Sequence, residues 1–220
     1  MNIARYIDHT LLKAVATPTD IKKLCNEALK YNFFSVCVNS CYVKEAYSYV
    51  KDSETKVCSV IGFPLGAMST EAKVFEAKTA IADGAEEIDM VINVGQLKAG
   101  NASYVMQEIK AIKEAIGSHV LKVIIETCYL TDEEKKLVSE LSVEANADFV
   151  KTSTGFGTGG ATIEDITIMK NSVTDKAKLK ASGGVRDFET AKMYIDAGVE
   201  RLGTSNGIAI IEGLTTGEGY

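Results

Sequence analysis

The chain alternates short runs of apolar, mostly β-branched residues with longer segments in which apolar positions recur every three or four residues. The first pattern is typical of buried strands and the second of amphipathic helices. Eight short runs occur, each followed by a segment of helical period. The predicted strands cover residues 7–10, 33–38, 56–62, 87–93, 121–126, 148–152, 178–182 and 201–204.

Residues at the expected helix ends support this division. Thr17 places a capping hydroxyl directly before a proline, and Thr131 is followed by three acidic residues that favour a helix N-terminus. Gly84, Gly117 and Gly198 lie where helices should stop. The chain therefore carries start and stop signals between its predicted strands.

Strict alternation of strands and helices requires a parallel sheet, which can stay open as a doubly wound sheet or close into a barrel. Eight repeats in 220 residues favour the closed (β/α)8 TIM barrel of the α/β class. No long stretch of Pro, Ser and Gly interrupts the pattern, so we expect residues 1–220 to form a single domain with a short C-terminal tail ending in Tyr220. In such a barrel the active site lies at the carboxyl ends of the strands.

Composition narrows the classes of partner. The chain has 24 Lys and Arg against 30 Asp and Glu, a formal charge of -6, which argues against a nucleic acid or an acidic membrane as its main partner. No apolar stretch approaches the roughly 18 residues of a membrane helix, and the first residues lack the apolar segment of a signal peptide. We therefore expect a cytoplasmic protein, with five reduced cysteines mostly in the core.

Three predicted strands carry a charged residue inside an otherwise apolar run: Asp89, Lys151 and Lys180. Because side chains alternate along a strand, Asp89 lies on the face opposite Ile88 and Met90, which suit the helix layer, and so it points into the barrel. The same alternation can turn both lysines inward. A charged residue at a strand end that faces water is the simpler explanation for any one of them. Three on strands that converge at one mouth favour a shared site.

Two lysines beside a carboxylate suit a specific chemistry. At pH 7 an ordinary lysine is neutral in only about 4 molecules in 10,000, but a second ammonium about 6 Å away lowers its pKa by roughly two units. A neutral lysine attacks a carbonyl to form a Schiff base, through which a carbon–carbon bond can break or form. Asp89 can move protons, directly or through a water. Strand geometry alone leaves open which lysine is the nucleophile.

Glycine-rich loops follow the last two predicted strands. Gly183 and Gly184 come after the seventh strand, and Thr204 and Ser205 lie where the eighth strand passes into its loop. Backbone amides freed by glycine, together with hydroxyl groups, bind phosphate without arginine, at the position where TIM barrels often hold one. The alternative is that both loops are simply tight turns.

Residues 155–160 match the dinucleotide fingerprint G-x-G-x-x-G, but they follow the sixth strand, and that strand contains Lys151. A nicotinamide cofactor is therefore disfavoured. His9 and His119 are far apart in sequence and have no metal-ligand spacing, so no metal is expected. Cys37 and Cys41 have no nearby histidine and are interpreted as small buried hydrophobic residues.

Taken together, these segments resemble the deoxyribose-phosphate aldolase family over nearly the whole chain. The motifs are VCVN (36–39), IGFPLG (61–66), EIDMVIN (87–93), KVIIET (122–127), DFVKTSTG (148–155), KASGGVR (180–186) and RLGTS (201–205). The resemblance implies a class I aldolase, without metal or organic cofactor, that reversibly cleaves 2-deoxy-D-ribose 5-phosphate to D-glyceraldehyde 3-phosphate and acetaldehyde. It implies a sugar-phosphate substrate and leaves open a homo-oligomer, dimer or tetramer.

The resemblance also assigns roles by position. Lys151 matches the Schiff-base lysine, Lys180 the second lysine that lowers its pKa, and Asp89 the group that moves protons. Tyr220 matches a C-terminal tyrosine that helps to move the proton at the acetaldehyde carbon, and Asp8 and Thr154 match supporting positions. The phosphate cradle falls on Gly183, Gly184, Thr204 and Ser205. Phe156 and Asn206 depart from the pattern of other members, which bears on phosphate recognition.

Other functions stay open on the sequence. One is a different reaction on a sugar phosphate, of the transaldolase or isomerase kind. Another is a catalytically silent barrel that binds a sugar phosphate for regulation, although such a protein has no reason to keep two costly inward lysines.

Overall fold

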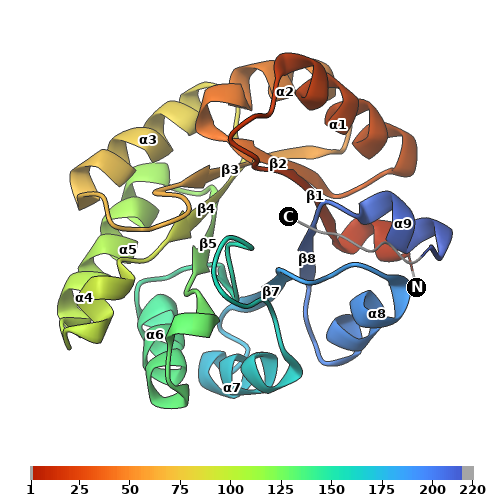
Figure 1. Ribbon diagram of the computed structural model, residues 1–220. Helices are drawn as coiled ribbons and strands as arrows, with labels where there is room; N and C mark the ends of the chain where they lie inside the picture. Colours follow the sequence, from red (N-terminus) through yellow and green to blue (C-terminus); the bar gives the residue numbers. More distant parts are fainter. Residues whose placement is uncertain (1, 215–220) are drawn as a thin grey trace.

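A computed structural model describes residues 2–214, and these residues form one closed barrel of eight parallel strands surrounded by helices (Figure 1). The strands are β1 (Ile7–Leu11), β2 (Ser35–Asn39), β3 (Lys56–Ile61), β4 (Glu87–Val91), β5 (Val120–Ile124), β6 (Phe149–Lys151), β7 (Lys178–Ser182) and β8 (Arg201–Thr204). Each strand pairs with the next in sequence, and β8 pairs with β1 to close the ring. The predicted TIM barrel and all eight strands are confirmed; the C-terminal tail with Tyr220 lies outside the described residues.

The helices form the outer layer of the barrel. They are α1 (Pro18–Tyr31), α2 (Val43–Val50), α3 (Thr70–Ala82), α4 (Val94–Lys98), α5 (Ala102–Ile116), α6 (Asp132–Glu144), α7 (Ile163–Val173), α8 (Phe188–Asp196) and α9 (Gly207–Glu212). Short 3-10 turns occupy Ile3–Tyr6, Ser40–Tyr42 and Thr127–Tyr129. No helix in the described part of the chain has both the length and the apolar character needed to cross a membrane.

The helix boundaries follow from local chemistry. Thr17 and Thr131 each accept a bond from the third residue of their helix, whose carboxylate binds back to the cap amide, so both helices begin with a full capping box. Gly117 ends α5 with a positive φ of 62°. Gly84 and Gly198 also have positive φ, one residue after the caps of α3 and α8. The predicted start and stop signals therefore operate as expected.

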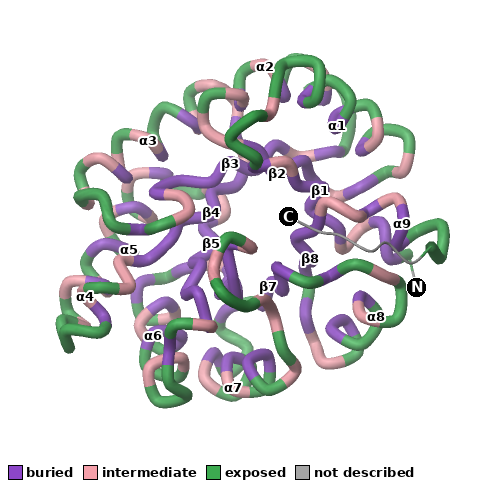
Figure 2. Tube along the Cα trace, viewed as in Figure 1, coloured by how far each residue is buried: buried purple, intermediate pink, exposed green. Residues whose placement is uncertain are grey.

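The hydrophobic core lies between the strands and the helices. Ile88 and Met90 on β4 are fully buried in this layer. Figure 2 shows the same division, with buried strands at the centre and exposed outer faces on the helices. Because successive residues alternate in direction, the other side of each strand faces the inside of the barrel, where the polar residues gather.

Candidate active site

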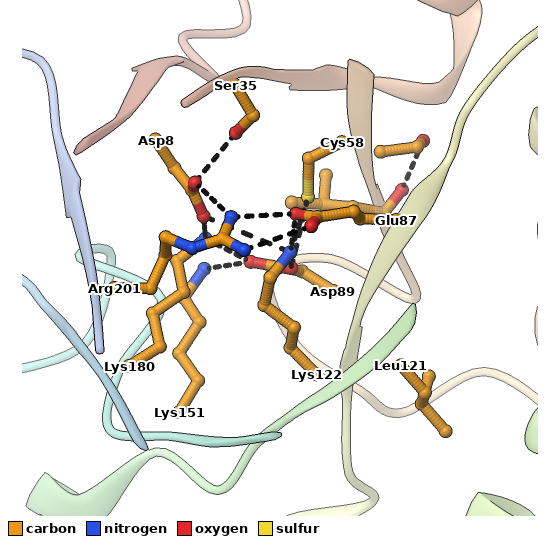
Figure 3. Close-up of polar contacts among 12 residues, drawn as sticks. Asp8, Ser35, Cys58, Glu87, Asp89, Leu121, Lys122, Lys151, Lys180 and Arg201 are labelled. Carbon is orange, nitrogen blue, oxygen red and sulfur yellow. Dashed lines mark hydrogen bonds and ion pairs between the residues drawn. The ribbon is translucent and has the colours of Figure 1, made fainter. Parts of the chain in front are cut away.

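The carboxylate of Asp89 binds three lysines inside the barrel (Figure 3). Its Oδ2 atom accepts from Lys151 Nζ and from Lys180 Nζ, each at 2.8 Å, and its Oδ1 atom accepts from Lys122 Nζ at 2.8 Å. Lys151 and Lys180 share one oxygen, so their nitrogens are at most 5.6 Å apart. The structure thus brings together the three inward charges predicted from the sequence.

Asp8 forms a second anchor for the lysines. Lys180 donates to Asp8 Oδ2 as well as to Asp89, and Asp8 Oδ1 accepts from Ser35 Oγ at 2.7 Å and Arg201 at 2.9 Å. Burial alone would raise the pKa of Asp8, but the attraction of Lys180 and Arg201 outweighs it and holds that pKa below its ordinary range. Asp8 is therefore an ionised partner of Lys180.

The same balance governs the residues bound to Asp89. Burial would raise the pKa of Asp89, but Lys122, Lys151 and Lys180 hold it well below its ordinary value. Burial would lower the pKa of Lys180, but Asp8 and Asp89 raise it instead. Asp89 therefore stays ionised at neutral pH, and Lys180 keeps its proton.

Three residues of this cluster were not predicted as site residues. Lys122 Nζ lies 2.6 Å from Glu87 Oε2 and 3.9 Å from Asp8 Oδ2, in addition to its bond with Asp89. Arg201 binds Glu87 at two points, both at 3.1 Å. Lys122 stands in an apolar run as Asp89 does, so the same signal could have found it. Glu87 and Arg201 are the first residues of their strands, where a charge ordinarily faces water.

The number of ion pairs distinguishes the three lysines of the cluster. The cluster holds three carboxylates and four cations, so full ionisation would leave one excess positive charge away from water; the members are Asp8, Glu87, Asp89, Lys122, Lys151, Lys180 and Arg201. Burying an uncompensated charge is costly. Lys151 has one carboxylate partner, whereas Lys180 has two and Lys122 three. Lys151 therefore makes the fewest ion pairs of the three lysines.

A cavity of about 220 Å³ lies at the carboxyl ends of β6, β7 and β8. Gly183 and Gly184 line it with φ of 80° and 83°, the left-handed region that favours glycine. The Ser205 side chain is half-buried at its edge, and Arg186 adds a cation. The glycine loops thus surround a space that suits a small anion.

Thr204, predicted as part of the phosphate cradle, is already engaged within the chain. The Thr204 hydroxyl donates to the Val185 carbonyl at 2.7 Å and accepts from the Asn206 amide at 2.9 Å, so its side chain fixes the loop after β8.

The segment 155–160, considered as a dinucleotide fingerprint, lines the same cavity, and a Cβ on Gly160 would lie 2.3 Å from the Gly183 carbonyl oxygen. Its glycines therefore allow two loops of one cavity to pack closely.

Thr154, predicted as a supporting residue, is held by Glu126. The Thr154 hydroxyl donates to Glu126 Oε2, the Thr154 amide donates to Oε1 at 3.1 Å, and the hydroxyl accepts from the Phe156 amide. Glu126 has a left-handed backbone, with φ of 55°, and burial raises the pKa of its carboxyl. This pair fixes the start of the loop that leads from Lys151 to the cavity.

One group among the described residues has the arrangement of metal ligands. The Sγ atoms of Cys37 and Cys58 and a carboxylate oxygen of Asp89 all lie within 4.8 Å of one another. A divalent cation there would compete with the lysine ammoniums that already bind both oxygens of Asp89, so the donor set does not suit one.

Cys37 is buried as expected, but Cys41 is exposed because it lies in the 3-10 turn after β2, so the expectation that it is buried is wrong.

The model of the DeoC/LacD family of aldolases matches residues 3–216. The chain belongs to this aldolase family. Among its curated relatives, the deoxyribose-phosphate aldolase of Finegoldia magna is 60% identical, over 97% of this chain and 100% of the relative. That of Carboxydothermus hydrogenoformans is also 60% identical, over 99% and 97%. The solved tetrameric deoxyribose-phosphate aldolase of Aeropyrum pernix is 33% identical, covers 96% of this chain and 89% of the other, and superposes with a TM-score of 0.88.

Proposed function

We propose that the chain is a deoxyribose-phosphate aldolase that cleaves 2-deoxy-D-ribose 5-phosphate reversibly to D-glyceraldehyde 3-phosphate and acetaldehyde. The observation that carries this proposal is the sharing of Asp89 Oδ2 by Lys151 and Lys180 in the middle of the barrel. Family membership and the full-length relatives named as this enzyme support the substrate.

In this proposal Lys151 is the nucleophile. It has the fewest carboxylate partners of the three lysines, and it retains 3% exposure where Lys122 and Lys180 have none. Its neutral amine attacks C1 of the open-chain sugar, and loss of water leaves a protonated Schiff base. The C3 hydroxyl then loses its proton, the bond between C2 and C3 breaks, and the electron pair moves into the C2–C1–N unit as an enamine.

The acid–base steps fall to the groups around Lys151. After glyceraldehyde 3-phosphate leaves, C2 of the enamine takes up a proton and water hydrolyses the Schiff base to release acetaldehyde. Asp89 contacts both Lys151 and Lys180, so it can pass protons between Lys180 and the substrate, directly or through a water. The Asp89 role and that of Tyr220, which lies outside the described residues, stay predictions.

The loops after β7 and β8 supply the phosphate site in this proposal. Lys151 ends β6, and the loop that follows it lines the same cavity as Gly183, Gly184 and Ser205. A phosphate held there leaves the aldehyde end of the sugar to extend toward Lys151. Phosphate binding would then orient C1 for attack.

The test is to incubate the protein with acetaldehyde, reduce with borohydride, and map the modified peptide by mass spectrometry. We expect a stable ethyl adduct on Lys151. An adduct on Lys180 would reverse the roles of the two lysines, and no adduct on a folded protein would favour a silent or differently reactive sugar-phosphate barrel. Release of acetaldehyde from deoxyribose 5-phosphate separates this activity from a transaldolase or isomerase.

The proposal also includes a homo-oligomer and a cytoplasmic location. The Aeropyrum pernix relative is described as a tetramer, which supports assembly of this chain into a dimer or tetramer. Light scattering will distinguish the 23.7 kDa monomer from its multiples.

A further inference from the structure

Two cysteines lie side by side on the inner wall of the barrel, next to the lysine cluster. Cys37 on β2 and Cys58 on β3 are register partners, so their side chains leave the sheet on the same face. Cys58 donates to Asp89 Oδ1 at 3.1 Å, which places that face inside the barrel (Figure 3). Both residues are fully buried, and their Sγ atoms lie within 4.8 Å of each other.

The backbone geometry permits a bond between the two sulfurs. Residues paired across adjacent strands have Cα atoms about 4.8 Å apart, inside the range of about 4.4–6.8 Å found for disulfides. Rotation of both side chains about χ1 can bring the sulfurs together, but Cys58 must then leave Asp89 Oδ1. It must also leave Lys122 Nζ, 3.3 Å from its sulfur.

The two thiols differ in their surroundings in a way that suits oxidation. The neighbouring Cys58 thiol, together with attraction from Lys180 and Lys151, lowers the pKa of Cys37 despite its burial. Burial raises the pKa of Cys58 well above its ordinary value, and the neighbouring Cys37 sulfur and Asp89 carboxylate raise it further. Cys37 is therefore the stronger nucleophile, with a protonated thiol next to it.

We propose that Cys37 and Cys58 are a modification site at which hydrogen peroxide closes a disulfide and reversibly switches off the neighbouring catalytic centre. The Cys37 sulfur attacks the peroxide, the O–O bond breaks, and water leaves, which gives a sulfenic acid. The Cys58 sulfur then attacks the Cys37 sulfur, the S–O bond breaks, and a second water leaves. The two thiols lose two electrons and two protons, and the peroxide is reduced.

The loss of activity follows from the contacts that the disulfide removes. Cys58 is one of four donors on Asp89, and Lys122 lies against its sulfur, so moving Cys58 shifts the carboxylate that binds Lys151 and Lys180. A displacement of about 1 Å at a reacting group can cost about a hundredfold in rate. We expect turnover to fall by at least about tenfold in the oxidised protein. This part of the inference rests on the proposed aldolase function.

The experiment treats the full-length protein with hydrogen peroxide and follows intact mass, peptide maps without reductant, and aldolase activity. The expected product is lighter by two hydrogen atoms, contains a linked peptide pair carrying residues 37 and 58, and recovers its activity in dithiothreitol. In Cys58→Ala we expect the loss of activity to become irreversible, because Cys37 then oxidises past the sulfenic acid with no thiol to resolve it.

A matched control replaces two less buried thiols. The double variant C41S/C128S should oxidise like the unchanged protein, because these cysteines lie outside the barrel cluster. A disulfide to any other cysteine, or free thiols at 37 and 58 after activity is lost, would overturn the proposal. The mass measurement needs no substrate, so a disulfide in a protein without aldolase activity would refute the proposed function and leave the modification site standing.

Discussion

Arg201 and Glu87 form a two-point ion pair at the amino-terminal end of the barrel, with both N–H···O distances at 3.1 Å. The same guanidinium binds Asp8, and the same carboxylate binds Lys122. Arg201 therefore holds Asp8, the partner of Lys180, and Glu87 holds Lys122, the partner of Asp89. Neither Arg201 nor Glu87 lines the cavity between the glycine loops.

Arg201→Lys should lower kcat by about tenfold while KM changes little, because lysine keeps the charge but cannot make the two parallel bonds. The loss of part of a buried pair should also lower stability, by up to about 3–5 kcal/mol. Steady-state kinetics and urea unfolding measure both. Lys178→Gln is the control, since it breaks the exposed pair with Glu200 and should cost no more than about 1 kcal/mol. A normal kcat in Arg201→Lys would contradict this role of Arg201 in holding Asp8.

Lys151→Ala should fold normally and lose turnover by about three orders of magnitude or more, because no other group supplies the neutral amine. Circular dichroism checks the fold, and the borohydride adduct should be absent. Lys180→Ala should also reduce turnover, but it retains Lys151 and so should still trap some acetaldehyde. Near-normal turnover of Lys151→Ala would disprove the Schiff-base assignment.

The low pKa values of Asp8 and Asp89 predict the acid sensitivity of the fold. A carboxyl with a folded pKa below its unfolded value of about 3.8 stabilises the protein above that pH and loses this contribution as pH falls through its folded pKa. The free energy of unfolding should therefore drop below about pH 4. In Asp8→Asn the protein should be less stable at neutral pH, and this acid-dependent drop should be smaller. Urea unfolding at a series of pH values tests the slope, and an unchanged slope would argue against an ionised Asp8.

Gly183→Ala should raise KM for deoxyribose 5-phosphate and leave kcat/KM for unphosphorylated deoxyribose nearly unchanged. A methyl group there would lie 2.9 Å from Gly160 Cα, at a φ of 80°, so the two loops of the cavity must separate. Gly100→Ala is a control with a φ of 78° and open space around it, far from the cavity; its cost is backbone strain of about 1–2 kcal/mol without a change in KM. Equal effects on both sugars would refute the phosphate cradle.

The sequence predicts the fold well because most strands are short, mainly apolar runs that alternate with segments bounded by helix signals. It also predicts the inward charges that interrupt apolar runs, and Asp89, Lys151 and Lys180 do meet. It could not predict the partners at strand ends, because a charge at the first residue of a strand carries no sign of its direction. Cys58 escapes notice for another reason, since a small buried thiol looks the same in sequence whether it packs in the core or contacts Asp89.

The role of a hydroxyl group in a loop is also hard to predict from the sequence. A threonine in a glycine loop predicts a phosphate ligand and an internal brace equally well, and the Thr204 hydroxyl is already committed to Val185 and Asn206. Which of these two roles the hydroxyl takes depends on the backbone groups around the loop, and the sequence pattern near the threonine does not specify their positions.

The ion pair between Asp8 on β1 and Arg201 on β8 bears on when the centre forms during synthesis. Asp8 is among the first residues translated and Arg201 among the last, and they meet only when the ring of strands closes. Until then Asp8, one of the two carboxylate partners of Lys180, lacks the Arg201 guanidinium that holds it in place. A nascent chain released before the eighth strand would contain every candidate catalytic lysine and still lack the assembled centre, so catalytic competence reports that the whole ring has closed.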